Sequence, residues 1–122
     1  MKDENRGMNP PNKDLRIRTK DFALRIIKLY VSLPRLAVAQ TLGNQLLRSG
    51  TSVGANYREA CRARFNAEFV SKLGDSLKEL EETSYWLELF ADSGTIRPQR
   101  LTLLIDETSQ LTAIFTSIAK KV

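Results

Sequence analysis

Apolar residues recur every three or four positions along four stretches of the chain, 20–33, 35–63, 66–91 and from Pro98 onward. This spacing places apolar side chains on one face of a helix. The expected inner positions are Phe22, Ile26, Leu29, Leu33, Leu42, Leu46, Val53, Tyr57, Ala60, Phe69, Leu73, Leu77, Leu80, Ser84, Leu87, Phe90, Leu101, Leu104, Thr108, Leu111, Phe115 and Ile118. No stretch alternates with the period of two that strands require. The pattern predicts an all-α protein, an antiparallel up-down-up-down four-helix bundle.

Residues typical of helix ends separate these stretches. Asn66 is the predicted N-cap of the third helix, with Phe65 and Val70 placed to form a hydrophobic staple. Gly94 is the expected stop of that helix, and Pro98 suits the first turn of the fourth.

The chain divides into a tail and one domain. We expect residues 1–18 to form a flexible N-terminal tail, because this segment contains Gly7, Pro10 and Pro11. Residues 19–122 are then a single four-helix bundle domain, of a size that can bury its own core.

The second helix contains small residues at unusual positions. Gly50 and Gly54 each cost about 1 kcal/mol relative to alanine inside a helix, so the close approach of another backbone is expected to offset them. Gly50 could instead break the segment into two helices, but the apolar register persists through both glycines and favours one continuous helix.

Several residues of the second and third helices are predicted to serve helix packing or an oligomer interface: Gly50, Gly54, Asn56, Tyr57, Tyr85 and Trp86. The amide of Asn56 needs partners if it is buried, and Glu82 or Thr83 is its expected partner. The hydroxyls of Ser49, Thr51 and Ser52 can alternatively bond back to carbonyls of their own helix.

The absence of histidine excludes zinc sites with imidazole ligands and nucleophile systems that depend on histidine. Glu79, Glu81 and Glu82 form a carboxylate run that is typical of a solvated or salt-bridged helix face rather than a metal site. We therefore expect a protein that is not an enzyme and that uses no cofactor and no metal.

Cysteine usage and hydropathy bear on the compartment. The single cysteine, Cys61, cannot form an intrachain disulfide, and no apolar leader or membrane-spanning run is present. These features predict a cytoplasmic protein with no membrane partner. Cys61 itself is expected to pack as a small apolar residue.

Charge is unevenly distributed along a chain whose net charge is +5. Residues 34–64 carry five basic residues and one acidic residue, whereas residues 65–96 carry two basic and seven acidic residues. The candidate nucleic-acid-binding residues are Lys20, Arg25, Lys28, Arg48, Arg58, Arg62 and Arg64. Arginine forks match phosphate oxygens. The alternative is that these arginines pair with the acidic third helix, within one subunit or between subunits.

The second and third helices resemble the bacterial family named after intervening sequences in 23S ribosomal RNA genes. The resemblance covers roughly residues 20–120. It rests on Gln45-Leu46-Leu47-Arg48-Ser49, Ser52-Val53-Gly54-Ala55-Asn56, Glu59-Ala60, Phe69-Val70-x-x-Leu73, Ser76-Leu77-x-Glu79-Leu80-Glu81-Glu82-Thr83 and Tyr85-Trp86-Leu87. It implies an antiparallel four-helix fold and a ring-like homo-oligomer, commonly a pentamer. It also implies kinship with the accessory proteins of diversity-generating retroelements, basic barrels that bind a reverse transcriptase and nucleic acid.

Charge and resemblance together indicate a non-enzymatic, homo-oligomeric basic adaptor. Its expected partners are further copies of itself, RNA or DNA, and a nucleic-acid enzyme such as a reverse transcriptase. The alternative is a protein–protein interaction scaffold that does not bind nucleic acid.

Overall fold

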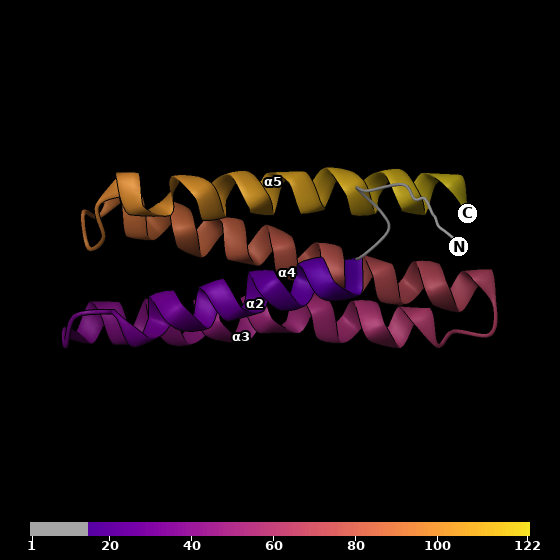
Figure 1. Cartoon of the computed structure of the whole chain (residues 1–122), viewed down its shortest axis with the longest axis horizontal. Coiled ribbons are helices and arrows are strands. Elements are labelled where there is room, and N and C mark those ends of the chain that lie inside the picture. The colour runs from indigo at the N-terminus through magenta and orange to yellow at the C-terminus, as the bar shows by residue number, and fades with distance from the viewer. Residues whose placement is uncertain (1–14) are drawn as a thin grey trace.

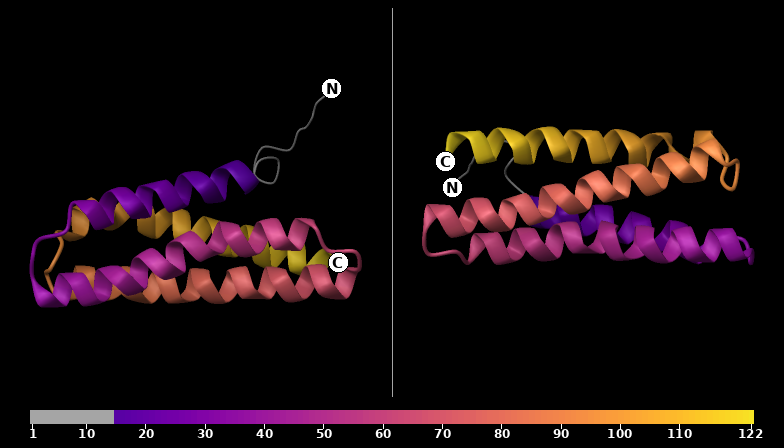
Figure 2. Two further views of the ribbon diagram at one scale, coloured as in Figure 1. Left: turned by 90° about the horizontal axis from the view of Figure 1, so that it is seen from below. Right: turned by 180° about the vertical axis from the view of Figure 1, so that it is seen from behind.

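Four helices account for most of residues 15–122, the part of the chain that the computed structural model describes. They are α2 (Leu15–Val31), α3 (Ala37–Cys61), α4 (Asn66–Asp92) and α5 (Pro98–Lys121). Consecutive helices lie side by side and run in opposite directions (Figures 1 and 2). This arrangement confirms the predicted all-α, up-down architecture. None of the four helices is both long enough and apolar enough to cross a bilayer.

The core forms where the inner faces of all four helices meet. Its largest fully buried side chains are Leu15, Phe22, Ile26, Leu46, Val53, Leu73, Leu80, Leu87, Phe90, Leu101, Leu111 and Phe115. All of these except Leu15 were predicted from the apolar spacing. One expected inner position is wrong by a single residue, because Ser84 is exposed and Thr83 is fully buried in its place.

The first helix begins earlier than predicted. Leu15 and Thr19 are buried one turn apart and extend the inner stripe of α2 toward the N-terminus, so the helix starts at Leu15 rather than near residue 20. Residues 15–18, which the sequence assigns to the tail, therefore belong to the bundle. The remainder of the predicted tail, residues 1–14, lies outside the described residues.

The start of α4 also differs from the prediction. Phe65, not Asn66, is the N-cap, and no side chain caps this end. Phe65 is 71% exposed instead of packing as a staple, while the Glu68 carboxylate accepts a hydrogen bond from the Arg64 N–H at 3.2 Å. At the other end the prediction is confirmed, since Gly94 follows the helix with a φ of 73°, which glycine adopts at little cost.

The glycines of α3 lie against α2 of the same chain, and α3 is continuous through them. A Cβ on Gly50 would lie 2.8 Å from Cγ1 of Ile26, and one on Gly54 would lie 2.9 Å from Oγ1 of Thr19. Both distances are too short for real contacts. The absence of these Cβ atoms thus lets α2 approach α3 closely, which offsets the helix-propensity cost of glycine.

The remaining sides of the bundle are packed unequally. The packing of α3 on α4 is extensive, and α5 packs mainly on α4, whereas contact between α2 and α5 is sparse. The α2–α5 side is therefore a seam along which a groove can form.

Candidate nucleic-acid interface

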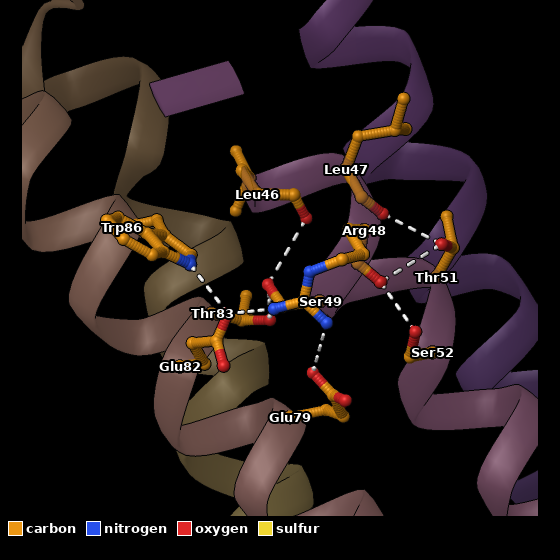
Figure 3. A network of polar contacts seen from close by, with 10 residues as sticks. All are labelled: Leu46, Leu47, Arg48, Ser49, Thr51, Ser52, Glu79, Glu82, Thr83 and Trp86. Carbon is orange, nitrogen blue, oxygen red and sulfur yellow. Dashed lines mark hydrogen bonds and ion pairs between the residues drawn. The ribbon is translucent and has the colours of Figure 1, made fainter. Parts of the chain in front are cut away.

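Arg48 projects from α3 toward α4 and is paired with acidic side chains of its own chain (Figure 3). Its guanidinium lies 3.4 Å from Oε1 of Glu79 and also forms an ion pair with Glu82. The Nε1–H of Trp86 donates to the same Glu82 carboxylate at 3.3 Å. For Arg48, the predicted alternative of pairing with the acidic helix within one subunit is correct. A phosphate would have to displace two carboxylates there.

Beneath this surface pair lie buried polar contacts between α3 and α4. Oγ of Ser49 and Oγ1 of Thr83 are 2.8 Å apart, and the Ser76 hydroxyl donates to the backbone carbonyl of Val53 at 2.9 Å. The predicted contact of Asn56 with Thr83 or Glu82 is wrong. Asn56 lies two turns further along α3 than Ser49, which already occupies the position opposite Thr83.

The other hydroxyls of α3 follow the local alternative. Thr51 and Ser52 donate to backbone carbonyls four residues earlier, at 2.8 and 2.7 Å. The hydrogen-bonding capacity of these hydroxyls is therefore used within α3 and not in a contact with another helix.

Arg58, Arg62 and Arg64 lie at the end of the molecule where α3 and α5 end and α4 begins (Figure 1). All three are exposed, and Arg58 donates to the backbone carbonyl of Arg16 in the first turn of α2 at 3.2 Å. Lys28 lies twelve residues beyond Arg16, about 18 Å along the helix. The structure therefore does not unite these arginines with the basic residues in the C-terminal half of α2.

Arg25 and Lys28 of α2 meet Arg100 of α5 across the seam. The three line a groove of about 370 Å³, together with Leu29, Ser32, Leu103 and Leu104. Arg100 donates to the Ser32 hydroxyl at 3.0 Å, which holds its guanidinium at the mouth of the groove. No acidic residue lines the groove, and within residues 15–122 none of the three cations has an ion-pair partner.

The sequence analysis missed Arg100. It lies 72 residues beyond Lys28, and only the antiparallel placement of α5 beside α2 brings the two together. The sequence offered one signal for Arg100. It lies in the first turn of α5, and in an antiparallel bundle that turn lies at the same end as the last turn of α2, which contains Lys28.

Nearer the start of α2, the seam is closed by a bidentate contact between Arg18 and Glu107. Nε of Arg18 lies 2.7 Å from Oε2 and Nη2 lies 2.9 Å from Oε1, and Nη2 also donates to Gln110 at 2.9 Å. These hydrogen bonds to Glu107 raise the pKa of Arg18, although burial opposes them. The Arg18–Glu107 contact thus holds α2 and α5 together on the side of the groove nearer the start of α2.

A second groove, of about 550 Å³, lies between α4 and α5. Most of its lining side chains are small or carry hydroxyls, and its charged residues are Lys78 and Glu81. One charge of each sign gives it no preference for phosphate. Within the described ranges, no cluster of three or more potential metal ligands occurs.

The aromatic candidates divide between core and surface. Tyr57 stacks on Phe115 of α5 with ring centroids 5.4 Å apart, and burial, followed by a hydrogen bond to Cys61, raises the pKa of Tyr57 to about 12. Trp86 is half-buried, whereas Tyr85 is 52% exposed. Cys61 is exposed, so its predicted apolar packing is wrong.

Comparison with known proteins gives one family. A family model described as "23S rRNA-intervening sequence protein" matches residues 13–117. The crystal structure of a protein of unknown function from the S23 ribosomal protein family of Bacteroides thetaiotaomicron is similar, with a TM-score of 0.81 and 37% identity over 86% of this chain and 97% of that one. No curated protein matches.

Proposed function

Because the chain belongs to the 23S rRNA-intervening sequence protein family, we propose that it is a non-enzymatic, homo-oligomeric adaptor of the cytoplasm that binds RNA or DNA. The observation that carries this proposal is the groove in which Arg25, Lys28 and Arg100 converge without a lining carboxylate. Phosphate groups are the ligands that such a cluster of cations favours.

The composition of the groove suits a nucleic-acid backbone. Two guanidinium groups can each offer paired N–H donors to phosphate oxygens, while Lys28 adds a point charge. Leu29 and Leu104 are almost fully buried at its floor, and Leu103 is 73% exposed at its rim. An apolar rim next to cations can contact sugars or bases, so the contact is not limited to inorganic anions.

A salt titration of binding to labelled RNA and DNA oligonucleotides tests the proposal. Three phosphate contacts contribute about 2 to 3 to the slope of log K against log salt concentration. The variant Arg25→Gln/Lys28→Gln/Arg100→Gln should lose that part of the slope and weaken binding roughly uniformly across sequences.

The matched control is Arg58→Gln/Arg62→Gln/Arg64→Gln, which removes three exposed arginines from the far end of the bundle and leaves the groove intact. It should retain most of the affinity. Absence of binding at low salt, or binding that is indifferent to salt, would end the proposal. Equal losses in both triple variants would leave nucleic-acid binding in place but remove the groove as its main site.

The resemblance supports a nucleic-acid enzyme, such as a reverse transcriptase, as the protein partner, as for the accessory proteins of diversity-generating retroelements. The groove variant distinguishes a protein partner from nucleic acid. Binding of a protein partner should survive this variant at moderate salt, whereas binding of nucleic acid should weaken.

The alternative is a protein–protein scaffold that binds no nucleic acid. It is favoured by the ion pairs in which α3 and α4 neutralise one another: Arg48 with Glu79 and Glu82, and Lys72 with Glu59 at 2.8 Å. The titration separates the two functions, since a scaffold gives no salt-dependent binding to any oligonucleotide.

A further inference from the structure

The outermost line of α2 is apolar in a position where a solvated helix is normally polar. Ile17, Leu24 and Val31 recur every seven residues, two helical turns, on the side opposite the buried positions of α2. They are 57%, 51% and 77% exposed, and Ile27 beside them is 39% exposed. We call Ile17, Leu24, Ile27 and Val31 the α2 ridge. It runs about 21 Å along the surface.

The outer line of the C-terminal half of α4 has the opposite character. Glu81, Tyr85, Glu88 and Asp92 follow one another at intervals of four, three and four residues, all exposed. None of the three carboxylates has an ion-pair partner among residues 15–122. We call these four residues the α4 acidic face, which centres on an aromatic ring that is 52% exposed.

We propose that the α2 ridge of one copy packs on the α4 acidic face of a second copy. This inference rests on the self-association in the proposed function and adds the surfaces that make it. Lys20 and Lys28 flank the ridge and outnumber Asp21 on the same side of α2. Lys20, which does not line the groove, meets the carboxylates of α4, while the ridge covers Tyr85, a residue type that often anchors interfaces.

Charge also decides against pairing of two identical ridges. A ridge-to-ridge contact would bring Lys20 and Lys28 of both copies together, and like charges across an interface are unfavourable. Contact between two different faces is heterologous: each copy uses its ridge on one neighbour and its acidic face on another. Such contacts close into rings or continue as filaments.

The experiment measures mass by sedimentation without nucleic acid, so that its outcome is independent of the groove. Leu24→Asp/Val31→Asp destroys the ridge and keeps the acidic face. Tyr85→Lys/Glu88→Lys destroys the acidic face and keeps the ridge. Each variant alone should sediment as a single 13.8 kDa chain. An equimolar mixture should form a species of twice that mass, because the two intact faces can still meet once.

The control is Phe65→Asp, which changes an apolar residue as exposed as Val31 but remote from both faces. It should keep the mass of the wild type. Helical circular dichroism and melting confirm that each variant folds. If an aspartate variant does not fold, Leu24→Gln/Val31→Gln replaces it.

Four results overturn the inference in different ways. A wild-type chain that remains single at high concentration removes self-association and with it that part of the proposed function. Variants that keep the wild-type mass remove these two faces only. Single-chain variants that do not combine in the mixture overturn the heterologous contact, whereas association of Tyr85→Lys/Glu88→Lys alone would replace it with a contact between two ridges.

Discussion

Ser49 and Thr83 face each other across the interior of the α3–α4 pair, both completely buried, with their hydroxyl oxygens 2.8 Å apart. Ser49 also lies 3.3 Å from the carbonyl oxygen of Leu46. Two polar groups in an apolar core are tolerable because each gives the other a partner. The pair therefore fixes how α3 and α4 are aligned along their length.

The losses of stability on removing these two hydroxyls should not be additive. Ser49→Ala leaves the Thr83 hydroxyl without its partner in the core, and we expect a loss of about 1–3 kcal/mol in the free energy of unfolding. Ser49→Ala/Thr83→Val should lose less than the sum of the single variants in chemical denaturation. Thr51→Ala, which removes a hydroxyl bonded within α3, is the control and should change stability little. Additive losses would contradict the coupling.

Two glycines with different surroundings should respond oppositely to alanine. At Gly50 the new Cβ would lie 2.8 Å from Cγ1 of the buried Ile26, so overpacking should cost about 1–3 kcal/mol, more than the gain in helix propensity. At Gly74 no atom beyond the chain neighbours and the local helix backbone lies within 4 Å of the new Cβ, and Gly74→Ala should stabilise by up to about 1 kcal/mol. Thermal melting of both variants measures the difference, and an equal effect at the two positions would refute this account of α2–α3 packing.

Tyr57 should make stability depend on alkaline pH. Its pKa is raised from 10.0 to about 12 in the folded chain. Above pH 10 the unfolded state loses the phenolic proton while the folded state retains it, so this contribution is full below pH 10 and is lost as the pH rises toward 12. Tyrosinate absorbance should show a late-titrating component that disappears in Tyr57→Phe. Cys61→Ser should leave most of the rise, because burial is its largest cause. A titration without the late component would contradict the prediction.

The Arg18–Glu107 contact should be worth more than an ordinary surface ion pair. Its two side chains are 27% and 15% exposed, and the contact is bidentate. We expect a coupling of about 1 kcal/mol from the double-mutant cycle of Arg18→Met and Glu107→Gln, reduced at high salt. Denaturant unfolding at two salt concentrations measures it. A coupling near zero would show that the α2–α5 seam is held by other contacts.

The fold was predictable because helical periodicity is a local property. The inner residues from Phe22 to Phe115 and the end of the third helix before Gly94 follow from spacing and backbone preference alone. The start of α2 was missed because Thr19, a polar residue, is buried by donating its hydroxyl to the carbonyl of Leu15 at 2.6 Å. An apolar pattern cannot reveal a threonine that satisfies itself within its helix.

The candidate site was less predictable, because it depends on which helices become neighbours. Arg25 and Lys28 were identified from charge, but Arg100 joins them only through the antiparallel order of α2 and α5. Asn56 and Ser49 illustrate the same limit within the helix pair. Both lie on the same side of α3, two turns apart, and the sequence analysis chose the amide of Asn56 as the buried partner, yet the alignment of α3 along α4 places the hydroxyl of Ser49 opposite Thr83.

Because contact between α2 and α5 is sparse, these two helices can separate while the α3–α4 packing stays in place. The α3–α4 pair has the most extensive packing in the bundle. In contrast, α2 and α5 are joined along the seam by the hydrogen bonds of Arg18 with Glu107 and of Arg100 with Ser32. Separation of α2 from α5 would expose Leu29 and Leu104 to water and leave the α3–α4 packing intact. Amide protons of α2 and α5 should therefore exchange with solvent sooner than those in the middle of α3 and α4. A ligand bound between α2 and α5 would slow this exchange.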